Sequence, residues 1–220
     1  MNGLFIVFEG GEGSGKSSLA RLLYEELVKT VDTILVNDPG GTDVGMDIRK
    51  ILLNPEKKSS ITTELYLYHA ARAQLVDEII LPALREGKVV ISDRFNDSTH
   101  VYQGDIRGWD KNTLNNLDDI TNKGIKPDIT FLCNVSATIG LKRSLKVNKD
   151  RVNGDGQDES KWELEGLNTH KKINLAFVNR MLSRSQDGDI IYYLDSNNLT
   201  ITEMLDIVME KISRHVMDLS

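Results

Sequence analysis

The chain has 220 residues, 40% of them hydrophobic and 27% charged, which is typical of a globular protein that buries one core, and we expect a single domain over 1–220. The formal net charge of −6 argues against broad attraction to nucleic acid or to an anionic membrane, so an anionic ligand must be held by a local cluster of basic groups. The one cysteine, Cys133, excludes an internal disulfide, and the lack of a long apolar stretch or a basic leader predicts a cytoplasmic protein.

Five apolar runs predict β-strands, at 4–8, 33–36, 89–92, 129–135 and 190–194. Helical patterns separate them, and one long helix is predicted over 64–86. Strands that alternate with helices predict an α/β fold, a five-stranded parallel sheet with helices on both faces and ligands at the carboxyl ends of the strands. A polar segment with glycines and no periodicity predicts a mobile lid loop at about 147–160.

The first predicted strand leads into the pattern G-x-x-x-x-G-K-S, which is typical of a phosphate-binding loop. Its glycines allow the backbone to wrap a phosphate chain, and the following helix adds a partial positive charge. We expect Lys16 to reach the β- and γ-phosphates of ATP and Ser17 to ligate Mg²⁺. The predicted nucleotide-binding residues are Gly10, Gly11, Glu12, Gly13, Ser14, Gly15, Lys16, Ser17 and Ser18. Alone, this loop does not distinguish a kinase from a GTPase, a motor or a transporter ATPase.

The third predicted strand ends in Asp93 and Arg94. Asp93 can organise Mg²⁺ through its water shell, and Arg94 can hold a second phosphate. The alternative is an Asp–Arg pair that only caps the next helix. After the second strand, the turn that contains Asp38 and Pro39 brings backbone close to a ligand, although an ordinary turn has the same pattern.

Tyr68 and Arg72 lie four residues apart on the long predicted helix and therefore share a face. A ring and a guanidinium on one face can stack on a base and hydrogen-bond to it. The same spacing also fits a tyrosine that packs under a surface arginine.

Taken together, these motifs resemble the thymidylate kinase family of the P-loop nucleoside monophosphate kinases. The family's R-E-P-G-G-T, F-Y-A-A-R-x-Q, D-R-[YFH] and S-T-x-A-Y-Q-G patterns correspond to 37–42, 68–74, 93–95 and 98–104. Their order and spacing agree over nearly the whole chain. The resemblance implies transfer of the γ-phosphoryl group of ATP to dTMP, with Mg²⁺, by a cytoplasmic homodimer.

The resemblance also implies a role for each matching residue. Tyr68 would stack on the pyrimidine, Arg72 would contact its exocyclic oxygen, and Tyr102 would crowd the 2′ position. The acceptor phosphate would be held by Arg94, helped by Arg49. Thr99 and Gln103 would lie at the base and sugar edges, and Asp38 or Glu12 would face the 3′-hydroxyl or the metal. The predicted substrate-binding set is Asp38, Pro39, Arg49, Tyr68, Arg72, Arg94, Thr99, Tyr102 and Gln103, and the predicted metal ligands are Ser17 and Asp93.

Bacterial-type members have no basic residue inside the phosphate loop and supply a transition-state cation from the lid. This loop has Glu12, Gly13 and Ser14 at those positions. Our first choice for the cation is Arg151, because a planar guanidinium can bridge phosphate oxygens. A solvated lid charge with no catalytic role is the alternative. The predicted catalytic residues are Lys16, Arg94, Arg151, Asp93 and Glu12.

Departures from the family patterns leave other substrates open. His69 and His100, with the Tyr68 hydroxyl, would suit a polar group at the pyrimidine 5-position, as in 5-hydroxymethyl-dUMP, although histidines on helices are commonly surface or capping groups. A deoxynucleoside kinase is a second alternative, but Arg49 and Arg94 favour an acceptor that carries a phosphate. A nucleotide-dependent switch without turnover is the alternative from another class of protein.

Overall fold

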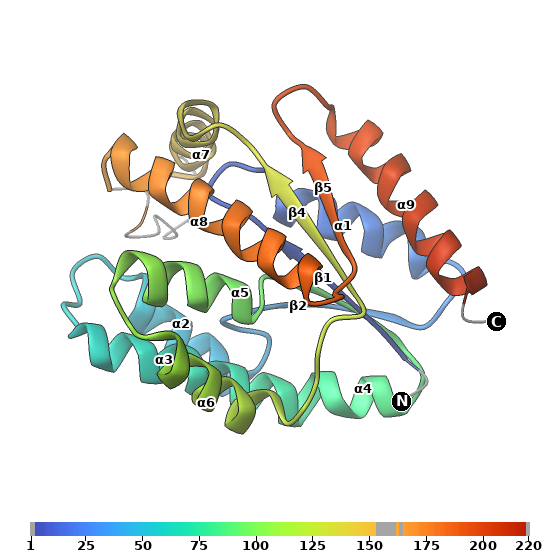
Figure 1. Cartoon of the computed structure of the whole chain (residues 1–220), viewed down its shortest axis with the longest axis horizontal. Helices are drawn as coiled ribbons and strands as arrows, with labels where there is room; N and C mark the ends of the chain where they lie inside the picture. Colours follow the sequence, from blue (N-terminus) through green and yellow to red (C-terminus); the bar gives the residue numbers. More distant parts are fainter. Residues whose placement is uncertain (1–2, 153–161, 163–164, 219–220) are drawn as a thin grey trace.

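The computed structural model describes residues 3–152, 162 and 165–218, with the side chains of all of these except 147–152 and 218. At its centre is a parallel sheet with the strand order β2-β3-β1-β4-β5 (Figure 1). The strands are β1 (Leu4–Glu9), β2 (Thr33–Asn37), β3 (Val89–Asp93), β4 (Ile129–Asn134) and β5 (Ile191–Asp195). The parallel five-stranded sheet confirms the predicted α/β class, and each strand end lies within one residue of its predicted position.

Helices follow each strand and cover both faces of the sheet (Figure 1). They are α1 (Lys16–Leu27), α2 (Asp43–Leu53), α3 (Ile61–Leu75), α4 (Leu81–Arg85), α5 (Asn96–Thr99), α6 (Lys111–Asn122), α7 (Ala137–Val152), α8 (Leu167–Gln186) and α9 (Ile201–Asp218), with the π-helical segments η1 (Val76–Ile80) and η2 (His100–Ile106). Within the described residues, none of these helices is long and apolar enough to cross a membrane.

The core lies on both faces of β1, because successive strand side chains point in opposite directions. Ile6 and Phe8 pack with buried residues of α1 and α9, whereas Phe5 and Val7 pack with residues of α3, η1 and α4. A strand that is buried on both faces is apolar throughout, and this explains why the sequence shows continuous apolar runs. Cys133 lies in the same core and is buried.

The long helix predicted at 64–86 is observed as three consecutive helical segments from Ile61 to Arg85. It begins at Ile61 because the Ser60 hydroxyl accepts the amide of Thr63 at 3.1 Å. The π-helical segment η1 stands directly before α4, which has a proline, Pro82, in its first turn. Proline has no N–H to donate and its ring crowds the preceding turn, so the hydrogen-bond pattern shifts there.

The predicted lid differs from the structure in its first part. The sequence predicts a loop from residue 147, but α7 continues to Val152. Neither glycine nor proline occurs between Gly140 and Gly154, so the polar residues of this stretch do not by themselves end the helix. Residues 153–160 lie outside the described part of the chain, and the lid therefore stays a prediction.

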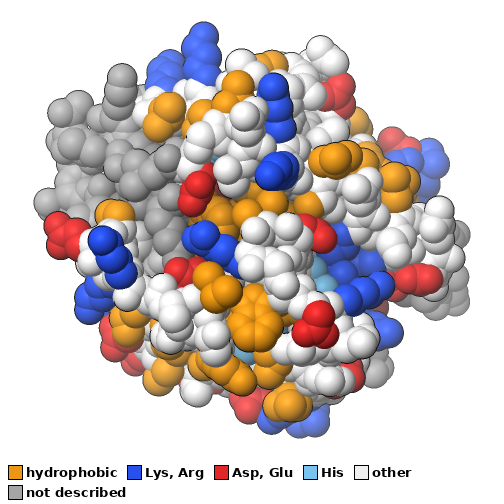
Figure 2. All heavy atoms as spheres, turned by 60° about the vertical axis from the view of Figure 1, so that its left-hand side comes forward, with side chains coloured by type: hydrophobic (Ala, Val, Ile, Leu, Met, Phe, Trp, Pro, Cys, Tyr) orange, Lys and Arg blue, Asp and Glu red, His pale blue; other side chains and the backbone are white. Residues whose placement is uncertain are grey.

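On the face shown in Figure 2, basic and acidic side chains are interspersed with hydrophobic ones. Basic groups that bind an anionic ligand must therefore gather locally, and they do so in the pocket described below.

Candidate active site

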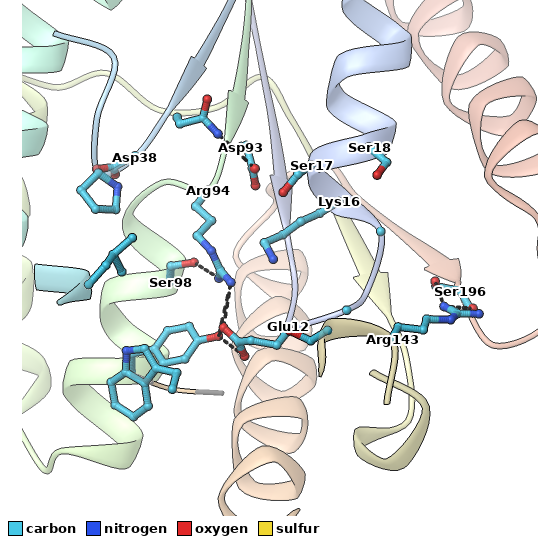
Figure 3. A pocket seen from close by; sticks show the side chains of 18 of the residues that line it. Glu12, Lys16, Ser17, Ser18, Asp38, Asp93, Arg94, Ser98, Arg143 and Ser196 are labelled. Carbon is cyan, nitrogen blue, oxygen red and sulfur yellow. Dashed lines mark hydrogen bonds and ion pairs between the residues drawn. The ribbon is translucent and has the colours of Figure 1, made fainter. Parts of the chain in front are cut away.

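A pocket of about 800 Å³ opens at the carboxyl ends of β1, β2 and β3 (Figure 3). Parallel strands present their carboxyl ends at one edge of the sheet, which is where ligands bind in such folds. Most of the predicted site residues line it: Glu12, Gly13, Gly15, Lys16, Ser17, Ser18, Asp38, Pro39, Arg49, Tyr68, Arg72, Asp93, Arg94, Thr99, Tyr102 and Gln103. The fold thus brings motifs that are far apart in the sequence into one cavity.

The loop between β1 and α1 has a backbone that glycine permits. Gly13 has a φ of 66°, and a Cβ there would lie 2.0 Å from the carbonyl oxygen of Gly140. A Cβ on Gly10 would lie 2.4 Å from the carbonyl oxygen of Cys133. The loop delivers the N-terminus of α1 to the pocket, where its free amides and the helix dipole favour a phosphate.

Three polar groups of the loop and of β3 face the same part of the pocket, namely Lys16, Ser17 and Asp93 (Figure 3). The Lys16 ammonium donates to the carbonyl oxygen of Gly11 at 3.3 Å, and burial together with Arg94 lowers the pKa of Lys16. One Asp93 oxygen accepts from the Asn37 amide at 3.2 Å, while the buried Oδ1 has no hydrogen-bond partner among the described residues. A hydroxyl and a carboxylate with a free oxygen are the hard donors that suit Mg²⁺.

Glu12 lies at the centre of a polar cluster beside them (Figure 3). The Tyr102 hydroxyl lies 2.7 and 2.8 Å from its two oxygens, and Arg94 Nη2 donates to Oε1 at 3.1 Å. Burial opposes ionisation of Glu12, but Arg94, Lys16 and Tyr102 outweigh it, so the pKa of Glu12 lies below its ordinary value. Burial and the charge of Glu12 raise the pKa of Tyr102 well above its ordinary value. At neutral pH the cluster therefore contains a carboxylate and a phenol.

Arg94 has an uncommon backbone conformation that aims its side chain into the pocket. Its φ is 73°, which few residues other than glycine adopt, and its amide donates to the carbonyl oxygen of Phe8 at 2.9 Å. The guanidinium also donates to the carbonyl oxygen of Gly10 at 3.1 Å and to Ser98 Oγ at 2.9 Å. Such a backbone conformation persists only where surrounding contacts fix it. Residues in such conformations are common at functional sites.

Arg72 also lines the pocket and belongs to a buried charged network. Its Nε donates to Asp38 at 2.6 Å and its Nη1 donates to Asp118 at 3.3 Å. Its Nη2 donates to the carbonyl oxygen of Phe95 and to Thr99 Oγ1, at 3.2 and 2.6 Å. Burial opposes its charge, but Asp38 and Asp118 raise the pKa of Arg72 above its ordinary value. Arg72 is therefore a buried ion-pair partner of Asp38. The family resemblance had implied that Asp38 or Glu12 faces the sugar 3′-hydroxyl or the metal.

The two histidines that suggested a polar base pocket face Asp118 and are not among the described residues that line the cavity. His100 Nε2 lies 2.8 Å from Asp118 Oδ2, and His69 Nε2 lies 3.4 Å from Oδ1. His69 Nδ1 is also 3.0 Å from the carbonyl oxygen of Leu65. The expectation that these imidazoles meet a substituent on the pyrimidine is wrong, because both rings are used in the buried network behind the pocket.

An aromatic group and an amide stand where a base is predicted. Tyr68 lines the pocket and is hydrogen-bonded to Trp162, whose ring lies 4.8 Å from the ring of Tyr102. Gln103 is fully buried, and neither its amide nitrogen nor its amide oxygen has a hydrogen-bond partner among the described residues. An amide with both groups free can read one donor and one acceptor on a base edge.

Four predicted residues are not among the described lining residues: Gly10, Gly11, Ser14 and Arg151. The first three belong to the phosphate loop, and Ser14 is buried. The backbone of Arg151 lies in α7, and its side chain lies outside the described part of the structure. Its catalytic role therefore stays a prediction.

Sequence reasoning missed several lining residues, among them Asn37, Ser98, Trp162, Ser196, Thr200 and Met204. Asn37 and Ser98 lie inside motifs that the sequence already singled out. Arg143 donates to the carbonyl oxygen and the hydroxyl of Ser196, at 2.9 and 3.0 Å. Ser196 follows β5, and the rule that carboxyl strand ends share one edge would have found it without a motif.

The phosphate loop, the basic pocket and the sheet order together define a P-loop kinase that acts on nucleoside monophosphates. A family model described as thymidylate kinase matches residues 8–196, so the chain belongs to the thymidylate kinase family. It is 44% identical to the thymidylate kinase of Geotalea uraniireducens (strain Rf4) over 179 residues, 80% of this chain and 82% of that protein. It is 40% identical to the thymidylate kinase of Protochlamydia amoebophila over 198 residues, 89% and 86% of the two chains.

A solved structure gives the same result for the fold. The crystal structure of thymidylate kinase from Ehrlichia chaffeensis is similar to this chain with a TM-score of 0.71 and 25% identity. The similarity covers 97% of this chain and 99% of that chain.

Proposed function

We propose that this chain transfers the γ-phosphoryl group of ATP to dTMP, giving dTDP and ADP. The observation that carries the proposal is that Lys16 of the phosphate loop and Arg94 of the β3 end line one pocket. These cations can hold two phosphate groups close together, as phosphoryl transfer requires. Its family relatives are named thymidylate kinases, and this favours dTMP as the acceptor.

The acceptor would lie between Arg94 and Arg72. Arg94, with Arg49, would hold the acceptor phosphate; in support, both arginines line the pocket, and Arg49 donates to the carbonyl oxygen of Pro39 at 2.8 Å. Tyr68 would stack on the base, and Thr99 and Gln103 would lie at its edge. A nucleoside without a phosphate would make no use of these two cations, so the pocket favours a monophosphate over a deoxynucleoside.

The donor nucleotide would lie along the phosphate loop. Lys16 would contact the β- and γ-phosphates, and Ser17 and Asp93 would hold Mg²⁺. Bound Mg²⁺ neutralises charge on the phosphates. Glu12, fixed by Tyr102, would face the sugar hydroxyl, and the ring of Tyr102 would exclude a 2′-hydroxyl. Phosphoryl transfer then needs no covalent intermediate on the protein, because alignment and charge neutralisation provide the catalysis.

A turnover assay with a loop variant tests the proposal. Wild-type protein with ATP, Mg²⁺ and dTMP should form ADP and dTDP in equal amounts. Lys16→Met should lower the rate by about a thousandfold or more, because a cation on the transferring group is lost. Binding of both nucleotides without any dTDP would contradict the proposal and favour the nucleotide-dependent switch.

We also propose that the chain is a cytoplasmic homodimer, on the basis of family resemblance. Exposed hydrophobic side chains on neighbouring helices support a subunit interface, namely Val44, Met46 and Ile51 of α2, Ile61 and Tyr66 of α3 and Ile120 of α6. Light scattering should give twice the chain mass, and Tyr66→Asp should give a monomer. Leu182→Asp, at an exposed position of α8, is the matched control and should stay dimeric. A monomeric wild-type protein would contradict the dimer.

A further inference from the structure

Glu9 is a buried carboxylate that the proposed mechanism does not use. It is the last residue of β1, is fully buried, and is not among the described residues that line the pocket. Its Oε1 accepts the backbone amides of Phe95 and Ser98, at 2.9 and 3.1 Å. Its Oε2 accepts the Ser98 hydroxyl at 2.6 Å. All three donors belong to the segment that directly follows Arg94.

These hydrogen bonds reach the guanidinium of Arg94 in one further step. Ser98 gives its only hydroxyl proton to Glu9, which leaves its lone pairs for Arg94 Nη1 at 2.9 Å. Figure 3 shows Ser98 and Glu12 on either side of this guanidinium. Glu9 also fixes the amide of Phe95, the residue after the unusual φ of Arg94. A continuous path therefore connects Glu9, Ser98 and Arg94.

We propose that Glu9 is a positioning residue for the acceptor phosphate, which acts through Ser98 to hold the Arg94 guanidinium in the pocket. The inference rests on the proposed phosphate-binding role of Arg94. Glu9 does not touch the substrate. A carboxylate suits this position because it is the one side chain of this size that accepts all three donors at once.

On balance, the surroundings of Glu9 oppose its ionisation. Burial and the neighbouring Asp97 raise the pKa of Glu9 to about 7, against the effect of Arg94. Asp97 is itself paired with Arg180 and Arg184 of α8. Arg72 of α3 and Cys133 of β4 also lie within electrostatic range of Glu9. The hydrogen bonds from Ser98 and Phe95 favour the carboxylate form, so the same contacts that hold this segment also help to keep Glu9 ionised.

Two variants remove the path at different points. Glu9→Gln keeps the shape and one acceptor oxygen, but its amide nitrogen cannot accept the Ser98 hydroxyl. Ser98→Ala leaves Glu9 its two backbone donors and removes the hydroxyl that connects Glu9 to Arg94. The matched control is Asp128→Asn, because Asp128 accepts the amide of Phe5 at 2.7 Å and does not belong to the path. Each is assayed above the pKa of Glu9 for KM of dTMP, KM of ATP and inhibition by thymidine.

We expect Glu9→Gln and Ser98→Ala each to raise KM for dTMP by about tenfold or more, and the control by less than about twofold. KM for ATP and the inhibition constant of thymidine, which has no phosphate, should stay within about twofold of wild type. In the Arg94→Met variant, the addition of Glu9→Gln should cause no further rise in KM for dTMP.

Equal weakening of dTMP and thymidine would overturn the inference, because it would show general damage to the pocket. An unchanged KM for dTMP in Ser98→Ala would also overturn the inference, even if the Glu9→Gln variant does not fold. These results are distinct from failure of the proposed function, in which the wild-type protein itself forms no dTDP.

Discussion

The hydroxyl of Tyr102 and the carboxylate of Glu12 form a paired contact, with oxygen–oxygen distances of 2.7 and 2.8 Å. The ring of Tyr102 is fixed independently, because it packs on Trp162 at 4.8 Å and on Phe177 at 5.9 Å between ring centres. Glu12 thus receives a donor whose position is set by hydrophobic packing. This links the aromatic cluster of η2 and α8 to the phosphate loop.

Tyr102→Phe separates these two roles of the tyrosine. The ring and its packing remain, but Glu12 loses a donor, and we expect kcat/KM for dTMP to fall by about tenfold. The preference for dTMP over its ribose counterpart should persist, because the ring still crowds the 2′ position. Steady-state kinetics with both acceptors measure this. Unchanged activity towards dTMP together with a lost sugar preference would contradict the assignment.

Arg94→Met tests the acceptor phosphate site. The variant removes a guanidinium that contacts Glu12, Ser98 and the Gly10 carbonyl oxygen, and kcat/KM for dTMP should fall by about a thousandfold. KM for ATP should change by less than about threefold, since Lys16 and the loop remain. A larger effect on ATP than on dTMP would place Arg94 on the donor side instead.

Arg72→Met should destabilise the fold as well as the site. It leaves the carboxylates of Asp38 and Asp118 buried without their cation, and removing one member of such a buried set costs about 3–5 kcal/mol. Urea unfolding measures the loss. Lys50→Met, which breaks the exposed pair of Lys50 with Asp47, is the control and should leave the urea midpoint unchanged. Equal midpoints for the two variants would contradict the importance of the buried network.

The stability should depend on pH through Glu9, whose pKa is raised from 4.5 to about 7 in the folded protein. Between these values the folded state keeps a proton that the unfolded chain has released, so this group's contribution to stability is lost as pH rises. Glu9→Gln removes that loss, and its unfolding free energy relative to wild type should increase by up to about 3 kcal/mol from about pH 5 to about pH 8.

The wild-type protein serves as the reference for Glu9→Gln because all other titrating groups are present in both proteins. His100, whose pKa is lowered mainly by burial, binds fewer protons when folded and contributes a slope of the opposite sign in each. Urea titrations at several pH values give the difference. A difference that is constant across this range would show that Glu9 keeps an ordinary pKa.

The sequence predicted the sheet almost completely, because strands that are buried on both faces must be apolar throughout. It also predicted which loops would meet, since carboxyl ends of parallel strands share an edge. The end of α7 was missed because polarity at 147–152 resembles a loop as much as a helix. The helix before Pro82 was predicted as uniform because a π-turn has no pattern of its own in the sequence.

Side-chain partners within the site were harder to predict than the site itself. Arg72 and Tyr68 both line the pocket, but the pairing of Arg72 with Asp38 and Asp118 requires three segments of the chain to meet. His69 and His100 were assigned to the base pocket because both lie in motifs that were expected to contact the substrate. The sequence does not reveal that both imidazoles face the carboxylate of Asp118, which only the fold brings to them. Glu9 was not singled out at all, because only the fold brings its carboxylate to the amide of Phe95, next to Arg94.

Product analysis with a panel of acceptors tests the central claim most directly. The protein is incubated with ATP, Mg²⁺ and, in separate reactions, dTMP, other deoxynucleoside monophosphates, 5-hydroxymethyl-dUMP and thymidine, and the products are separated by chromatography. We predict that dTMP is converted to dTDP, with kcat/KM about a hundredfold or more above that of thymidine, because Arg94 requires a phosphate. Faster conversion of thymidine or of 5-hydroxymethyl-dUMP than of dTMP would contradict it.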